Sequence, residues 1–218
     1  KTPSFGFDSH IYWFKLNIIS HRQNDETFIL EIDYPILDYV DLYLVKQKII
    51  REHYQAGDKY KYNKRPIDHH NLLFPLKLDQ HQSYTMYIRV KTSSAVLLPI
   101  ELWLRDSFFE QDQYNAMIQG SYYGAMLLIV IYNFFIYFWI REKRYLYYVG
   151  FIFFFALFEA TLSGLTYQLF WPGSPYVANK SLTISLGLMI FYESNSQYYQ
   201  FCELNLFRLC PHHPISLY

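Results

Sequence analysis

Aromatic side chains in alternating segments are the residues of this chain best suited to molecular recognition. Trp13, Tyr43, Tyr87 and Trp103 each fall in a run with the pattern of a β-strand. Sandwich domains that bind sugars present such rings, whose apolar body and polar tip suit stacking on a pyranose. These four residues are therefore candidates for a ligand-binding surface. Because aromatic residues form 21% of the chain, a core or homodimer interface is the alternative.

Two arginines add a second kind of candidate. The guanidinium groups of Arg65 and Arg89 can bind a carboxylate or phosphate. Arginines that point outward from a strand also pair across the sheet or stay in solvent. We therefore rank both arginines below the aromatic residues as ligand contacts.

Two groups of side chains have the types found in metal sites: His53, His69, His70 and His81, and Asp33, Asp38 and Asp41. The histidine spacings fit no established ligand pattern, which favours solvated loop histidines. The aspartates could hold a structural calcium, but calcium takes about 6 to 8 oxygen ligands and few are visible. We expect neither a metal nor a cofactor.

The chain lacks the motifs of nucleophilic or acid-base catalysis. It contains no GxSxG, no glycine-rich phosphate loop and no HExxH. An enzyme is therefore not expected, although a glycan-processing enzyme with a carboxylate pair stays an alternative, as does an adhesion or scaffolding module. A net charge of +0 also argues against nucleic acid as a partner.

The first hundred residues have the alternation of an antiparallel β-sandwich. In residues 83–91, Met86, Ile88 and Val90 oppose Tyr87, Arg89 and Lys91, so one face is buried. The other predicted strands are residues 10–18, 27–33, 40–46, 49–55, 72–78 and 97–104. We predict a sandwich domain over residues 1–106.

A helix follows the sandwich and continues into a membrane span. Ser107 and Glu110 have the spacing of a capping box, which predicts a juxtamembrane helix over residues 107–119. Residues 120–140 carry no charge and would reach about 31 Å as a helix, enough to cross a bilayer. Three cations follow: Arg141, Lys143 and Arg144. By the positive-inside rule this end is cytoplasmic, so the sandwich is extracytoplasmic.

Further spans are predicted at residues 145–171 and about 181–201, which gives two to three spans in residues 120–201. Residues 202–218 have neither a span nor amphipathic periodicity, and are not assigned; a reading-frame error or truncation is one hypothesis for them. The chain begins at Lys1 without the signal segment that export requires, so we expect it to be a fragment.

Four residues within the predicted spans are candidates for helix packing. Gly120 and Gly124 have small-xxx-small spacing, which lets a helix backbone approach closely. Glu159 is the only charge in residues 145–171 and is expected near mid-membrane, facing the bundle. It would act either as a polar switch or as a structural hydrogen-bond partner of a group such as Asn133.

The order of several segments resembles a known family. YWFKLNI (residues 12–18), RPIDHHNLLFPLKL (65–78) and TMYIRVKTSS (85–94) precede GSYYGAM, IYNFFIYFWIREKRYLYYV and SGLTYQLFWPG. Together they resemble the bacterial seven-transmembrane receptors with diverse intracellular signalling modules (7TMR-DISM). The predicted sandwich domain, residues 1–106, resembles that family's second extracellular domain type.

The resemblance implies a sensor in the bacterial inner membrane. It implies a jelly-roll sandwich similar to carbohydrate-binding modules, in the periplasm or outside the cell, and therefore a small, carbohydrate-like ligand. It also implies a bilayer-embedded helical bundle and a cytoplasmic signalling module. The expected function is transmission of ligand binding through the spans to that module.

Overall fold

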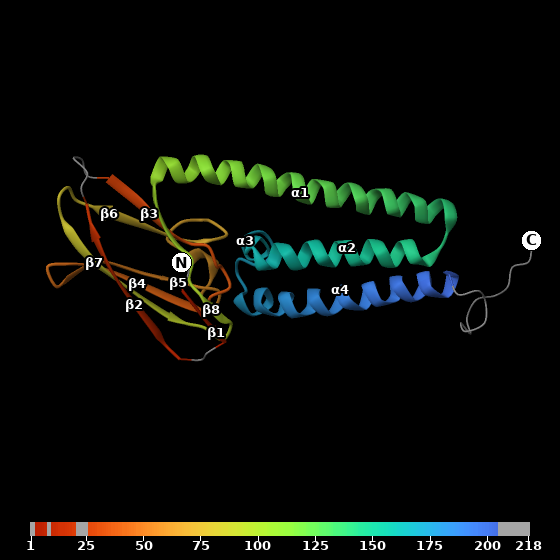
Figure 1. The fold of residues 1–218 in the computed structure, drawn as a ribbon, viewed down its shortest axis with the longest axis horizontal. Coiled ribbons are helices and arrows are strands. Elements are labelled where there is room, and N and C mark those ends of the chain that lie inside the picture. The colour runs from red at the N-terminus through yellow and green to blue at the C-terminus, as the bar shows by residue number, and fades with distance from the viewer. Residues whose placement is uncertain (1–2, 8–9, 21–25, 205–218) are drawn as a thin grey trace, which may run out of the picture. The chain divides into compact units, whose positions relative to one another are not determined.

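The computed structural model of the chain describes residues 3–7, 10–20 and 26–204. The strands are β1 (Ser4–Phe7), β2 (Tyr12–Ile19), β3 (Glu26–Ile32), β4 (Tyr39–Lys46), β5 (Ile49–Ala56), β6 (Leu72–Leu78), β7 (Ser83–Lys91), β8 (Ala95–Leu97) and β9 (Ile100–Leu104). The helices are α1 (Arg105–Ile140), α2 (Lys143–Leu162), α3 (Leu165–Leu169) and α4 (Pro175–Leu204), with a 3-10 turn η1 (Tyr62–Lys64). Figure 1 shows this order.

Two antiparallel sheets enclose the core of the N-terminal domain. One has the order β2-β7-β4-β5 and the other β6-β3-β9, while β1 pairs with β8. Leu42 and Ile88 of the first sheet share one buried cluster with Leu30 and Phe74 of the second. The predicted antiparallel sandwich is confirmed.

The last predicted strand is divided in the structure. Residues 97–104 were expected as one strand, but β8 ends at Leu97 and β9 starts at Ile100. Pro99 lies between them and cannot donate a ladder hydrogen bond. The separated β8 pairs with β1, a strand that the alternation did not predict.

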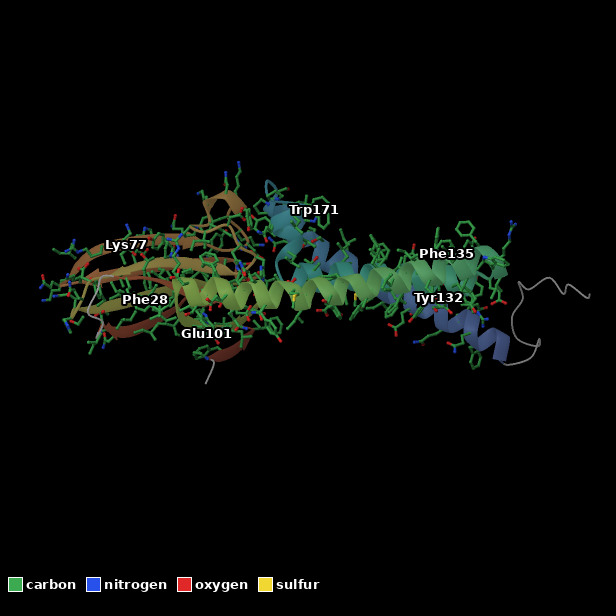
Figure 2. All side chains as sticks on the ribbon, turned by 90° about the horizontal axis from the view of Figure 1, so that it is seen from above. Phe28, Lys77, Glu101, Tyr132, Phe135 and Trp171 are labelled. Atoms are coloured by element: carbon green, nitrogen blue, oxygen red, sulfur yellow. The ribbon has the colours of Figure 1, made fainter. Side chains whose placement is uncertain are left out.

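Two of the described helices, α1 and α2, are long and apolar enough to cross a membrane. The 36 residues of α1 span about 54 Å, well beyond a hydrocarbon core of about 30 Å. Tyr132 and Phe135 project from α1 (Figure 2) and are 65% and 63% exposed. Such exposed apolar side chains suit contact with lipid.

The second apolar run is not one helix. A span over residues 145–171 was predicted, but α2 ends at Leu162 and Gly164 reverses the chain with φ of 76°. The short α3 and a turn containing Trp171 (Figure 2) lead to α4. The unassigned residues 202–218 contribute the end of α4, and residues 205–218 lie outside the described part.

The chain forms two compact units. The first comprises residues 1–117 and 159–182, and the second comprises residues 118–158 and 183–218. The first unit therefore contains the sandwich, the start of α1 and the connection from α2 to α4. All contacts of the candidate site described below lie within this unit.

Candidate functional site

The outer face of the four-stranded sheet collects most of the predicted ligand residues. Strand register places two rows of residues across β2, β7, β4 and β5: Trp13, Arg89, Asp41 and Gln55, and Lys15, Tyr87, Tyr43 and His53. We call these eight residues the aromatic face. Three of the four predicted aromatic residues and one predicted arginine lie on it.

The rings of the aromatic face stack on one another. The Trp13 and Tyr43 ring centroids are 6.1 Å apart, and Tyr43 lies 4.3 Å from the His53 ring with an interplanar angle of 6°. Trp13 is 57% exposed. Lys15 Nζ lies 5.9 Å from the centroid of Tyr87. The face thus presents apolar ring surface beside polar tips.

A buried carboxylate fixes the polar half of the aromatic face. Arg89 Nη1 donates to Asp41 Oδ2 at 2.5 Å, and Gln55 Nε2 donates to Asp41 Oδ1 at 2.9 Å. His53 Nε2 lies 4.0 Å from the same Oδ1. Because Asp41 accepts hydrogen bonds from both Arg89 and Gln55, these two side chains are held in place before any ligand binds.

The other two predicted ligand residues lie elsewhere. Trp103 is on β9, where its Nε1 donates to Glu31 Oε2 at 3.0 Å and its ring packs beside the buried Phe108 of α1. Arg65 lies in the loop between β5 and β6, residues 57–71, which we call the coupling loop. Neither residue shares a surface with the aromatic face, because β9 belongs to the other sheet and the loop leaves the sheet edge.

Arg65 holds the coupling loop together. Its Nη1 donates to the carbonyl oxygens of His69 and His70, both at 2.7 Å, and of Asn71 at 3.3 Å. The guanidinium carbon lies 4.8 Å from the centroid of the Tyr62 ring and 5.5 Å from that of Tyr167. Arg65, a candidate ligand contact in the sequence, therefore acts inside the loop as a structural clamp.

The coupling loop contacts the connection between α2 and α4. Tyr167 of α3 donates its hydroxyl to the carbonyl oxygen of Tyr60. Asp68 Oδ1 accepts from the Tyr62 hydroxyl at 2.7 Å and from Gln168 Nε2 at 3.1 Å. The Tyr62 amide also donates to the carbonyl oxygen of Pro172 at 3.3 Å. We call this contact the joint.

A glycine sets how closely the joint can pack. A Cβ atom on Gly164 would lie 2.7 Å from the carbonyl oxygen of His70 and 2.9 Å from Pro35 Cβ. Asn179 at the start of α4 donates to the carbonyl oxygen of Asp58 at 3.4 Å. Backbone of the α2 to α4 connection therefore touches backbone of the sandwich loops.

The same loop also contacts the start of α1. His69 Nε2 lies 3.0 Å from Asp112 Oδ1, and the His69 ring lies 5.5 Å from that of Phe108. His69 Nδ1 accepts from the Asn71 amide at 3.0 Å, so the ring donates through Nε2. One loop is thereby bonded both to α1 and to the connection that leads into α4.

Burial shifts the pKa values of three titratable side chains at and beside the joint. Burial, followed by the nearby Asp38 carboxylate, raises the pKa of Asp58 to about 7. Burial, with His69 close by, lowers the pKa of His70 to about 4, which keeps that ring neutral. Burial also lowers the pKa of Arg65 from its usual value. The joint is therefore sensitive to protonation of Asp58 in the neutral range.

The residue types considered as metal ligands are dispersed. Asp38 accepts from Ser93, Asp33 from Asn71, and Asp41 from Arg89. Among the described residues no group of three His, Cys, Asp or Glu side chains is placed to hold a metal ion. The prediction that the histidines are solvated is wrong for His69, which is 8% exposed and packed against α1.

Close helix packing in the described chain occurs at Gly150, and the packing role of Gly120 and Gly124 stays a prediction. A Cβ atom on Gly120 or Gly124 would meet nothing within 4 Å in the described chain. A Cβ atom on Gly150 of α2 would lie 2.3 Å from Cδ1 of Tyr192 of α4. The absence of a side chain at Gly150 therefore allows the Tyr192 ring of α4 to pack directly against the backbone of α2.

Two polar residues of the helices also differ from expectation. Asn133 donates its side-chain amide to the carbonyl oxygen of Ile129 in its own helix, at 2.9 Å. Glu159 lies in the last turn of α2, which ends at Leu162, and not at the middle of a span. The turn at Gly164 accounts for the difference, because it ends the helix before Trp171.

The joint was not found from the sequence. Tyr62 and Tyr167 are more than a hundred positions apart, and Asp58 sits in an ordinary polar stretch. One signal was present: Gly164 interrupts the apolar run before the turn residues Pro172 and Gly173. Such an early break indicates that the helix ends before Trp171.

Two family models match the chain over most of its length. Residues 1–104 match the model described as 7TMR-DISM extracellular 2, and residues 115–207 match the model described as 7TM diverse intracellular signalling. No curated protein matches the chain. The first match covers the sandwich, and the second covers most of α1, all of α2 and α3, and α4.

Proposed function

Because the chain belongs to the 7TMR-DISM signalling receptors, we propose that its extracellular domain senses a carbohydrate-like ligand on the aromatic face. The chain comprises the extracellular sensor domain and membrane-spanning portion of such a receptor. The observation that carries the ligand proposal is the stacked set of Trp13, Tyr43 and His53 beside the Arg89 and Asp41 pair. Stacking surface next to fixed hydrogen-bonding groups suits a sugar ring with its hydroxyl groups.

We propose binding without catalysis at the aromatic face. Glycoside hydrolysis uses two carboxyl groups about 5 to 9.5 Å apart. Asp41 is the single carboxylate among the eight residues of the face, and it is already paired with Arg89. A lone, neutralised carboxylate does not supply the acid and base that the reaction needs.

The route to the spans starts in β5. His53 and Gln55 of β5 belong to the aromatic face, and β5 leads directly into the coupling loop. That loop bonds to Asp112 of α1 through His69 and to Tyr167 of α3 beside Arg65. We propose that ligand binding shifts this loop between two positions and so biases the helices, which pass the signal to a cytoplasmic signalling module.

A binding assay on the full chain in lipid nanodiscs tests the proposed ligand class. Oligosaccharides and muropeptides are screened by thermal shift, because a compound that binds only the native state raises its Tm. Hits are followed by tryptophan fluorescence, since a sugar stacked on Trp13 alters the emission of that indole. We expect Trp13→Ala and Tyr43→Ala to weaken binding at least tenfold, consistent with the loss of about 1.4 kcal/mol or more.

Tyr114→Ala is the matched control, because Tyr114 is 57% exposed on α1 and away from the aromatic face. It should leave binding unchanged. A hit whose affinity is unaffected by Trp13→Ala would move the ligand site elsewhere. No hit in either compound class, together with self-association that Trp13→Ala abolishes, would instead identify the face as an interaction surface.

A further inference from the structure

A cavity of about 110 Å³ lies at the joint, apart from the aromatic face. Its walls come from the sandwich loops, including Asp58, Arg65 and Ser94, and from the α2 to α4 connection, including Thr166 and Ala178. All of these residues belong to the first compact unit. This volume suits a small molecule.

The polar groups around the cavity are incompletely paired. Asp58 Oδ1, Thr166 Oγ1, and both Nε and Nη2 of Arg65 are buried without a hydrogen-bond partner among the described residues. Asp58 is 9% exposed and Thr166 is 1% exposed. Leaving buried groups of this kind unsatisfied is costly, especially when they are charged. A molecule that pairs with them would therefore be bound favourably.

The arrangement of these atoms indicates the chemistry of that molecule. Arg65 donates through Nη1 to the carbonyl groups of the coupling loop. The N–H groups of Nε and Nη2, on the other edge of the guanidinium, remain available for a ligand. That edge presents two parallel N–H donors, a geometry that matches a carboxylate. Asp58 supplies a carboxylate oxygen for a cationic or neutral donor, and Thr166 supplies a hydroxyl that can donate or accept.

We infer that the cavity binds a small free amino acid. Its carboxylate pairs with the Nε and Nη2 edge of Arg65, and its ammonium group pairs with Asp58. Glycine and alanine have the required size, whereas a branched or long side chain exceeds the space. An occupant contacts both the sandwich loops and the α2 to α4 connection, so its binding stabilises the joint and acts on the spans independently of the aromatic face.

The test uses the full chain in nanodiscs, because half of the cavity comes from residues 161–182. Isothermal titration and thermal shift are measured with glycine, L-alanine, D-alanine and L-leucine. Acetate and methylamine present the two charged groups separately. We expect saturable binding of glycine or an alanine, at least tenfold weaker binding of acetate and methylamine, and no binding of leucine.

Two variants examine the cavity without removing the arginine clamp. Ala178→Leu fills the space from α4, and Thr166→Val removes a hydroxyl with little change of shape; each should weaken binding at least tenfold. Trp13→Ala is the control and should bind glycine as the unmodified chain does. If Ala178→Leu fails to fold, Thr166→Val and the size series decide the question.

Two results would overturn the inference. Absence of heat and of a Tm change with every amino acid up to about 10 mM would leave water as the occupant of the cavity. Binding that survives both Thr166→Val and Ala178→Leu would place the amino acid elsewhere. Loss of sugar binding at the aromatic face, by contrast, would leave glycine binding intact, so the two proposals can fail separately.

Discussion

The aromatic face and the joint use similar residues in opposite ways. On the face, Arg89 is paired with Asp41, and the Trp13 ring on the neighbouring strand is open to solvent. At the joint, Arg65 lies beside both the Tyr62 and the Tyr167 ring, and one edge of its guanidinium is buried without a described partner. On the face, the Asp41 carboxylate is already paired before a ligand binds. The joint is a contact whose strength depends on how its buried groups are satisfied.

This difference predicts that substitutions at the joint destabilise the fold more than substitutions on the aromatic face. The largest loss of stability is expected at Arg65. Arg65→Gln removes charged hydrogen bonds to the carbonyl groups of His69, His70 and Asn71 inside the coupling loop. We expect the free energy of unfolding to fall by about 3 to 5 kcal/mol. Chemical denaturation in nanodiscs measures it. Lys64→Gln is the control, since Lys64 is exposed, and an equal loss in both variants would contradict the clamp.

A smaller loss of stability is expected at Gly164, where the backbone of the α2 to α4 connection packs against the backbone of the coupling loop. Gly164→Ala places a Cβ atom against the His70 carbonyl oxygen and imposes a left-handed φ of 76° on alanine. We expect a loss of about 2 to 3 kcal/mol. Gly173→Ala is the matched control, because a Cβ atom there meets nothing within 4 Å. Hydrogen exchange of the coupling loop should rise only in the Gly164 variant; unchanged protection would separate the glycine from the joint.

The smallest effect is a pH dependence carried by Asp58. Its pKa is about 7 in the folded chain and about 3.8 when exposed, so between these values the folded state binds the extra proton. Stability from this group is therefore present at low pH and declines as pH rises toward about 7. From about pH 5.5 to about pH 7 the decline is at most about 2 kcal/mol.

Asp58→Asn should remove that slope, which is seen as Tm against pH in the variant and the unmodified chain. Two charged neighbours act on the pKa of Asp58. The carboxylate of Asp38 favours the protonated form of Asp58, and the ammonium group of Lys59 opposes protonation. His70, with a pKa lowered to about 4, contributes in the opposite direction in both proteins, so it cancels in the difference. Parallel curves would show that Asp58 does not titrate in this range.

The sequence revealed the aromatic face better than the joint for a physical reason. Alternation in β7 identifies Tyr87 and Arg89 as outward residues from local spacing alone. Which neighbours they meet depends on strand register, and the sequence did not predict that Trp13 and Tyr43 would stack. The contact of Arg65 with Tyr167 depends on packing between distant segments, for which no local pattern exists.

In the helical region, too, local sequence patterns predicted the elements but not the contacts between distant segments. Apolar length identified the helices, since uncharged runs of this length leave few other structures. It did not locate the end of α2, because Gly164 turns the chain within a stretch that remains apolar. Apolar length also did not identify Gly150 as a close-packing position, because the need for glycine there is set by the facing residue Tyr192.

The direct succession of β9 and α1 has a consequence for how the sensor can change over evolution. β9 ends at Leu104 and α1 begins at Arg105, so no linker absorbs a change of length. A single residue inserted here turns the helix by about 100° and lengthens it by about 1.5 Å. Insertions at this position should therefore be tolerated only in steps that restore a whole number of helical turns.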